Sequence, residues 1–315
     1  MNTMGPTRTP LPGGRWHFAH GPIELVIGAD TASGAPEHTP PTEETRPVAE
    51  RAPAASEAAL QAAHEQAWAR FQTVLQELVA ELPLLRLPVQ PGPCPVQGPI
   101  ARRMWQACAA LPTDFITPMA AVAGAVAQEI LAPYAQAGLP RAYVNNGGDI
   151  ALHLAPGAQW RVGLVADIAK RRAALDGGFT VQASDPVRGV ATSGWRGRSH
   201  SLGIADAVTV LAATAAQADA AATVIANAVN PAEPDAGLGI ERAPACSLKD
   251  DSDLGERLVT VQVPALPAGV ARAALRRGAR IAHQLQHVGL IHAAVLACQG
   301  QTLTVEPALH LQEAA

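Results

Sequence analysis

The sequence predicts an α+β protein with a largely antiparallel β-sheet, and two patterns along the chain lead to this prediction. Helical spacing of apolar residues dominates residues 58–136, and short β-type runs separated by turn residues dominate residues 141–212. Successive strands joined by turns pair antiparallel, whereas regular alternation of helix and strand would favour a parallel sheet. Apolar residues make up 48% of the chain and charged residues 16%, so the chain can build a large core.

The N-terminal part is expected to contain a tail, a hairpin and a long loop. Residues 1–14 lack a clear pattern and are predicted to be a flexible tail, followed by a single domain over residues 15–315. Arg15–His20 and Ile23–Gly28 flank a Gly-Pro pair, which predicts a hairpin. Residues 29–55 are rich in Pro, Thr and Glu and bury too little apolar surface to offset their ordering entropy. They are predicted to be a disordered loop.

Three helices should follow, at Ala58–Leu82, Ile100–Ala110 and Pro118–Gln136. Thr117 is the expected N-cap of the third, because Pro118 then occupies the first helical position, where its missing N–H costs nothing. The expected strands are Arg141–Asn145, Ile150–Leu154, Trp160–Ala166, Phe179–Ala183, Gly189–Ser193, His200–Ala212 and Arg257–Val263. An Ala-rich helix is predicted at Ala215–Ala228, a long helix at Ala268–Val288, and a last hairpin at His292–Cys298 and Thr302–Glu306.

Composition excludes several classes of function. The net charge is −4 and no basic run is present, so a nucleic-acid partner is not expected. No apolar run approaches the roughly 20 residues of a membrane span, and the N-terminus has no apolar signal-peptide core. The four cysteines form no CxxC pair, which argues against a structural zinc site. We therefore expect a cytoplasmic protein without a membrane partner. The apolar, low-charge composition favours a homodimer.

The first candidate site is the pair Asp219 and Thr223, which lie four residues apart on the Ala-rich helix and so share one face. A carboxylate on so apolar a helix needs a cation or several hydrogen-bond donors, because an unpaired buried charge is costly. Magnesium suits such a site, since it takes few protein oxygens and completes its shell with water and phosphates. Alternatively, Asp219 faces solvent near the helix N-terminus and interacts with the helix dipole.

The second candidate is the segment formed by Asn145, Asn146, Gly147, Gly148 and Asp149. Paired glycines permit positive φ and close approach of a ligand, and their N–H groups can bind an anion. An ordinary hairpin turn rich in Asn and Gly is the favoured alternative from spacing alone.

The third candidate is the loop of Thr192, Ser193, Gly194, Trp195, Arg196 and Arg198. Trp195 could stack on a planar ring and the arginines could bind a phosphate; alternatively, the loop is solvated and Trp195 packs on the sheet. Asp206 and His200 are the acid and the histidine nearest to these motifs, and we expect them to be catalytic. The acidic run Asp250–Asp253 could hold a cation, although such runs are usually solvated.

These motifs together resemble the ApbE superfamily of magnesium-dependent FAD:protein FMN transferases. The resemblance rests on FITPMAAVAGAVA, YVNNGGDIAL, GVATSGWRGRSHSLGIADAVTVLA, QADAAATVIANAV and DSDLGERLVTV, within Phe115–Val263. An uncharacterised family of cytoplasmic ApbE relatives in bacteria and archaea is more similar still. The resemblance implies an ApbE-like fold, Mg²⁺ bound by Asp219 and Thr223, and FAD or FMN near Gly147, Gly148 and Thr192–Gly194.

One motif departs from the transferase pattern. Where the transferases have His-x-x-Asp-Pro, this chain has Gly203-Ile204-Ala205-Asp206-Ala207, which keeps the acid and lacks the His and the Pro. The first functional hypothesis is therefore binding of a flavin or another nucleotide-like phosphate ligand with Mg²⁺, with FMN-transferase-like phosphoryl or nucleotidyl chemistry. The second is a biosynthetic enzyme of sulfur or one-carbon metabolism on the same scaffold. The third is a non-catalytic binding or scaffold protein.

Overall fold

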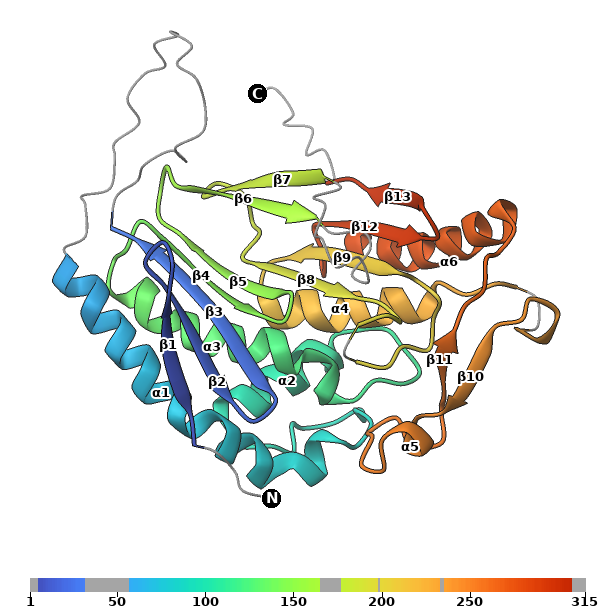
Figure 1. Cartoon of the computed structure of the whole chain (residues 1–315), viewed down its shortest axis with the longest axis horizontal. Helices are drawn as coiled ribbons and strands as arrows, with labels where there is room; N and C mark the ends of the chain where they lie inside the picture. Colours follow the sequence, from blue (N-terminus) through green and yellow to red (C-terminus); the bar gives the residue numbers. More distant parts are fainter. Residues whose placement is uncertain (1–4, 32–56, 165–176, 198, 233–234, 308–315) are drawn as a thin grey trace, which may run out of the picture.

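A computed structural model describes residues 5–31, 57–164, 177–197, 199–232 and 235–307. The strands of its main sheet are β1 (Thr7–Leu11), β2 (Arg15–His20), β3 (Ile23–Asp30), β4 (Arg141–Asn146), β5 (Asp149–Leu154), β8 (Gly189–Ser193), β9 (Ala207–Ala212), β12 (Ala293–Cys298) and β13 (Gln301–Val305). In this part of the chain the sheet has nine strands in the order β1-β2-β3-β4-β5-β8-β9-β12-β13, and all neighbours pair antiparallel (Figure 1). The α+β prediction is confirmed.

Helices pack against one face of this sheet (Figure 1). They are α1 (Glu57–Leu85), α2 (Pro99–Ala109), the 3₁₀ turn η1 (Pro118–Ala121), α3 (Val122–Gln136), α4 (Ala215–Ala228) and α6 (Ala268–His287). Helix α3 packs on β4 and β5, α4 packs on β8 and β9, and α2 lies over α3 and α4. None of the described helices is long and apolar enough to cross a membrane.

Two smaller ribbons flank the main sheet. The ribbon of β6 (Gln159–Leu164) and β7 (Gly177–Gln182) packs on the other face through a separate apolar cluster that includes Leu152, Val162 and Val190. The second ribbon consists of β10 (Glu241–Pro244) and β11 (Leu258–Gln262), with the short helix α5 (Ala245–Leu248) and the turn η2 (Asp235–Gly237) nearby.

Small residues allow α4 to lie unusually close to its neighbours. A Cβ atom on Gly124 of α3 would lie 2.3 Å from the carbonyl oxygen of Ala215, and one on Gly189 of β8 would lie 2.2 Å from the carbonyl carbon of Thr214. Real Cβ atoms do not come this close, so both positions require glycine. The Ala-rich composition of α4 therefore serves dense packing between α3 and the sheet.

Three predictions about the N-terminal part and β9 need correction. Residues 7–11, expected in a flexible tail, form the edge strand β1, which pairs with β2. Residues 29 and 30, expected in the loop, belong to β3; residues 32–55 of that loop lie outside the described part of the chain. The strand predicted from residue 200 begins only at Ala207. The backbone of residues 200–206 bonds to scattered partners, such as Val229 and Ala297, and to the Asn227 side chain instead of forming a ladder.

The helix predicted at Pro118–Gln136 is interrupted. It begins as η1 and becomes α-helical at Val122, and the side chain of Thr117 forms no cap. The Thr117 hydroxyl instead donates to a carboxylate oxygen of Asp253. The capping prediction failed because a partner distant in the sequence competes for this hydroxyl. β1, β10 and α5 were not predicted, since each is short and lacks a strong apolar pattern.

Candidate functional site

Asp219 on α4 caps the N-terminus of the neighbouring helix α3. Its Oδ2 atom accepts a hydrogen bond of 2.9 Å from the backbone N–H of Gly124, and the N–H of Ala123 also donates to the carboxylate. Helix α3 has no cap of its own, because its N-cap residue, Ala121, carries no polar side chain. The first N–H groups of a helix lack partners within the helix and carry partial positive charge. The Asp219 carboxylate, from another helix, accepts these N–H groups and offsets their positive charge.

A second acid, Asp149, lies close to Asp219. Burial, followed by the negative charge of Asp149, raises the pKa of Asp219 well above its usual range, while the N–H groups of Gly124 and Ala123 act in the opposite direction. Asp149 begins β5, and its Oδ1 accepts a hydrogen bond of 3.1 Å from the backbone N–H of Thr192 on β8. The fold therefore holds two carboxylates near each other where four elements meet, which are α3, α4, β5 and β8.

Thr223 lies one helical turn after Asp219 on α4 and is half-buried. The predicted shared face is thus present in the structure. Two carboxylates and a hydroxyl are oxygen donors of the kind that Mg²⁺ takes from proteins. Among the described residues, no group of three or more His, Cys, Asp or Glu side chains could hold a metal ion. An ion at this place would need oxygens from water or a ligand to complete its coordination.

The Asn145–Asp149 segment forms the two-residue loop of the β4–β5 hairpin, as the alternative interpretation expected. Asn146 pairs with Asp149, and Gly147 and Gly148 have φ values of 67° and 114°, which only glycine adopts readily. The Asn145 Oδ1 atom accepts a 2.8 Å hydrogen bond from the N–H of Gly148. The Asn146 side chain donates to the Ala123 carbonyl at 3.1 Å and so attaches the hairpin to the start of α3.

The loop after β8 is held by Asp206 instead of opening into solvent. The Asp206 Oδ1 atom accepts a hydrogen bond of 3.3 Å from Trp195 Nε1 and lies 3.3 Å from Arg196 Nε, and Oδ2 accepts from the N–H of Gln299. Trp195 is half-buried against the main core, and the Arg196 guanidinium lies 5.0 Å from the Trp195 ring centre. Gly194 allows this approach, because a Cβ there would lie 2.4 Å from the Asp206 carbonyl oxygen.

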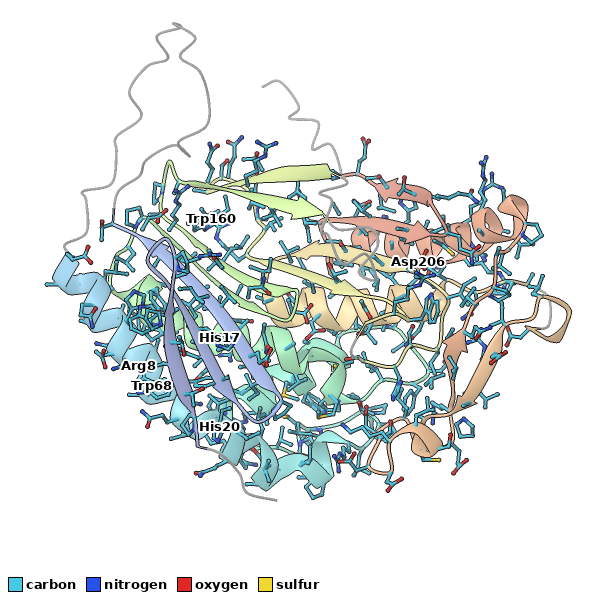
Figure 2. The ribbon with its side chains drawn as sticks, viewed as in Figure 1. Arg8, His17, His20, Trp68, Trp160 and Asp206 are labelled. Atoms are coloured by element: carbon cyan, nitrogen blue, oxygen red, sulfur yellow. The ribbon has the colours of Figure 1, made fainter. Side chains whose placement is uncertain are left out.

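The contacts of Asp206 show a structural role, and the expected catalytic role stays a prediction. Both of its carboxylate oxygens are engaged by the loop and by the β12–β13 turn, so it holds these segments together near β9 (Figure 2). His200 is half-buried in the irregular segment before β9 and makes no hydrogen bond with Asp206 or Asp219 among the described residues. The catalytic role expected for these two residues therefore stays a prediction.

The other predicted site residues of this loop have different surroundings. The hydroxyl groups of Thr192 and Thr209 lie 2.9 Å apart, while the N–H of Thr192 faces Asp149. Ser193 is half-buried at the end of β8. Arg198 lies outside the described residues.

Gly203 occupies the position where the resemblance places a histidine in the transferases. A Cβ atom on Gly203 would lie 1.9 Å from the carbonyl oxygen of Ala226 near the end of α4. The surrounding segment is fixed by the Leu202 N–H, which donates to Asn227 Oδ1 at 2.8 Å, and by the Thr260 hydroxyl, which donates to the Gly203 carbonyl at 2.8 Å. No side chain fits at this position unless α4 moves.

A contact between the acidic loop and η1 was not foreseen from the sequence. Asp253 accepts from the Thr117 hydroxyl, and the Arg257 guanidinium lies 3.3 Å from the centre of the Phe115 ring. Cys108 on α2 donates to the Thr117 carbonyl at 3.3 Å, and its pKa is raised well above the usual range by burial, then by the charges of Asp219 and Asp253. These contacts attach the acidic loop to the segment before η1. The sequence shows the acidic residues of this loop, but no local pattern predicts Thr117 as their hydrogen-bond partner.

Comparison with known proteins shows the family of this chain. A family model described as AbpE bacteria matches residues 8–304. The chain belongs to this family. It is also 38% identical over 164 residues to a UPF0280 protein of Methanothrix thermoacetophila, a match that covers 51% of this chain and 65% of that protein. A UPF0280 protein of Methanopyrus kandleri is 40% identical over 149 residues, covering 47% and 56% respectively. The matched region thus spans less than two thirds of the length of these relatives.

Two solved structures are similar at low identity. The flavinyl transferase ApbE of Pseudomonas stutzeri, in its apo form, is 13% identical with a TM-score of 0.40, and the match covers 97% of this chain and 96% of that one. The flavin transferase ApbE of Vibrio cholerae is also 13% identical, with a TM-score of 0.36 and coverage of 96% and 98%.

Proposed function

We propose that this ApbE-like protein binds a nucleotide-like phosphate ligand, with a flavin as the first candidate, together with Mg²⁺ beside Asp219. The observation that supports this proposal is that burial and then the charge of Asp149 raise the pKa of Asp219. Like charges near each other in a largely buried place disfavour the ionised form of Asp219, and a divalent cation would offset this repulsion. Membership of the AbpE family agrees with an ApbE-like role.

The donor set fits Mg²⁺. Asp219 and Thr223 would hold the ion from α4, and Asp149 would contribute negative charge from β5. Magnesium usually takes one or two carboxylates from the protein and further oxygens from water and substrate phosphates. When bound, it would neutralise phosphate charge during phosphoryl or nucleotidyl transfer.

The protein's own groups would position the ligand. The space beside Gly148 is open, since no atom lies within 4 Å of a Cβ built there, so a ligand can approach the backbone of the β4–β5 turn. Asn146 fixes this turn against α3, and the Thr117 hydroxyl attaches the acidic loop to the start of η1. These contacts would orient a phosphate-bearing ligand near Asp219 and keep part of it from water.

The test is thermal unfolding of the purified protein with FAD or FMN, with and without Mg²⁺. A ligand at 100 times its Kd should stabilise the protein by about 2.7 kcal/mol, which raises the Tm measurably. We expect the increase to require both the flavin and Mg²⁺ and to disappear in Asp219→Asn. The matched control is Asp185→Asn, because Asp185 accepts a backbone N–H of Gln182 on a distant turn. An unchanged Tm with every flavin and adenine nucleotide at saturation would contradict the proposal.

A second candidate is biosynthetic chemistry on a different substrate, and the packing of Gly203 favours it over protein flavin transfer. The transferase histidine has no counterpart here, and α4 fills the space that its side chain would need. Native purification followed by mass spectrometry of the bound small molecule separates the two candidates. A bound ligand other than a flavin would favour the second candidate, and a flavin would favour the first. If Asp219→Asn changed neither stability nor ligand content, a non-catalytic binding or scaffold role would be favoured.

A further inference from the structure

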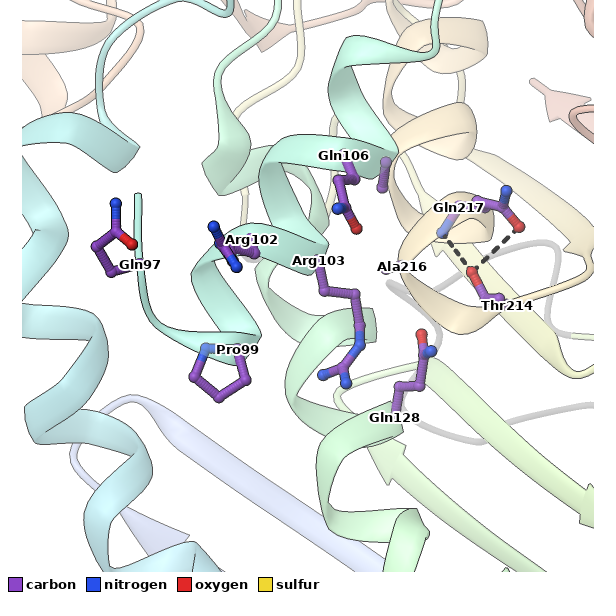
Figure 3. Close-up of a pocket in the computed structure, with 10 residues that line it drawn as sticks. Gln97, Pro99, Arg102, Arg103, Gln106, Gln128, Thr214, Ala216 and Gln217 are labelled. Atoms are coloured by element: carbon purple, nitrogen blue, oxygen red, sulfur yellow. Dashed lines mark hydrogen bonds between the residues drawn. The ribbon is translucent and has the colours of Figure 1, made fainter. Parts of the chain in front are cut away.

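A polar cavity of about 530 Å³ lies between α2, α3 and the start of α4. Its polar lining includes Arg102, Arg103 and Gln106 of α2, Gln128 of α3, and Thr214 and Gln217 at the start of α4 (Figure 3). Asp219 and Thr223 are not among the described residues that line it. The cavity is thus distinct from the Asp219 region and belongs to the outer side of the helical layer.

The two arginines at this cavity differ in their ion pairs. Arg103 pairs with an acid, and Arg102 has no ion pair with any described residue. Arg103 lies 3.0 Å from Glu129, which also pairs with Arg70 at 2.8 Å. Arg102 is exposed and donates through Nε to the Val96 carbonyl at 3.3 Å, and its guanidinium makes no ion pair with any described residue. The nearby acid Glu81 is directed to the backbone, since it accepts the N–H groups of Gln97 and Gly98 at 2.7 Å. Arg102 therefore offers a guanidinium without an ion-pair partner among the described residues, and the Glu81 carboxylate is the nearby negative charge.

The start of α4 adds to this positive potential. Thr214 caps α4 by accepting the N–H of Gln217 at 3.3 Å, and Ala216 of the first turn lines the cavity. The N-terminal turn of a helix carries partial positive charge and free N–H groups, and it favours anions.

A buried polar atom at the cavity lacks a partner. The Oε1 atom of Gln128 is buried and accepts no hydrogen bond from any described residue. An unsatisfied buried acceptor is unfavourable, so a ligand that offers an O–H or N–H donor would satisfy it. Gln106 and Gln217 provide further amide groups around the same space.

We infer that this cavity is a binding site for a small phosphorylated metabolite, whose phosphate lies between Arg102 and the start of α4 and whose hydroxyl group donates to Gln128. Phosphate matches the fork of an arginine guanidinium and the N-terminus of a helix. The cavity is larger than one phosphate group, so it has room for a polar organic part. This site goes beyond the proposed function and does not rest on it.

The first test is titration of the full chain with inorganic phosphate in magnesium-free buffer, with sodium chloride at matched ionic strength as reference. We expect saturable binding by calorimetry, and binding that is at least about tenfold weaker in Arg102→Gln, because a hydrogen bond to a charged group is lost. Arg272→Gln is the matched control, since Arg272 is an exposed helical arginine on α6. Asp219→Asn should bind phosphate like the wild type, so this result is independent of the proposed flavin site.

The second test compares glycerol 3-phosphate with inorganic phosphate in the wild type and in Gln128→Leu. The wild type should bind glycerol 3-phosphate more tightly, and the variant should lose this preference while it still binds phosphate. Absence of saturable phosphate binding, equal affinity in Arg102→Gln, or an unchanged preference in Gln128→Leu would overturn the inference.

Discussion

The Asp219 carboxylate on α4 accepts the backbone N–H of Gly124 on α3 at 2.9 Å, so a side chain of one helix caps the start of another. Gly124 contributes to this contact in two ways. Its backbone N–H is the donor, and the absence of a Cβ atom at this residue allows α4 to approach α3 closely. It also explains how an acid persists on an Ala-rich helix without a cationic side chain. Asp149 and Asp219 are brought together by this packing, and their mutual repulsion leads to the first prediction.

Without metal, ionisation of Asp219 should destabilise the fold. The folded-state pKa of Asp219 lies above its unfolded value, because of burial and then the charge of Asp149. Its contribution to stability is therefore present below the unfolded pKa and is lost as pH rises through the folded pKa. We expect Asp219→Asn in EDTA to be more stable than the wild type at pH 7, with the difference shrinking toward pH 4. Urea unfolding across this range measures the effect.

Asp185→Asn is the control, because the Asp185 carboxylate accepts the Gln182 N–H on a turn distant from Asp219. The prediction is contradicted if Asp219→Asn is less stable than the wild type at pH 7 in EDTA. In that case the hydrogen bonds to α3 would outweigh the repulsion from Asp149.

A side chain at Gly203 should be strongly destabilising. A Cβ would lie 1.9 Å from the Ala226 carbonyl oxygen, so Gly203→Ala must displace α4 or the loop. We expect a loss of about 3 kcal/mol in the free energy of unfolding, and a larger loss for Gly203→His. Gly269→Ala is the control, since it lies at the start of α6 with open space around it, and alanine there should be neutral or stabilising. Equal stability of Gly203→Ala and the wild type would refute the close packing.

The hydrogen bond from Thr117 to Asp253 should contribute to the stability of the acidic loop. Thr117→Val keeps the shape of the buried side chain and removes its hydroxyl, and we expect a loss of about 1.5 kcal/mol. Chemical unfolding of Thr117→Val, Asp253→Ala and the double variant gives the coupling energy directly. Asp250→Ala serves as the control, because Asp250 is exposed. Additive losses in the double variant would show that the two residues do not interact.

The four cysteines should differ in reactivity. Burial, with the charge of Asp206, raises the pKa of Cys298 to about 12, and burial also raises the pKa of Cys108. Only the thiolate reacts quickly, so iodoacetamide at pH 8 should modify the partly exposed Cys94 and Cys246 and leave the other two intact until urea is added. Peptide mass spectrometry reads out each site.

Cys246 offers an internal control for this experiment. Its pKa is raised chiefly by a hydrogen bond to Glu256, whose Oε1 lies 3.0 Å from the sulfur. Glu256→Gln should therefore speed alkylation of Cys246 and leave Cys94 unchanged. Early modification of Cys108 in the native protein would mean that the region around Asp219 opens readily.

Local patterns in the sequence were sufficient to predict the helix and the turn that carry the candidate site residues. Helix α4 has the predicted bounds, Ala215–Ala228, because Thr214 caps it and an unbroken run of helix-compatible residues follows. The Gly147-Gly148 pair predicted the two-residue turn, since few other residues tolerate positive φ at both positions. The shared face of Asp219 and Thr223 follows from helical geometry alone.

The tertiary structure alone decided which partners these residues have. Burial and then the charge of Asp149 raise the pKa of Asp219, Thr117 binds Asp253 instead of capping a helix, and Asp206 anchors the Trp195 loop. Strand β1 also exists only because β2 offers it a sheet edge. Periodicity and turn chemistry report on neighbours within a few residues. These contacts join segments far apart in the sequence, and the packing of α3, α4 and the sheet determines which of them can form.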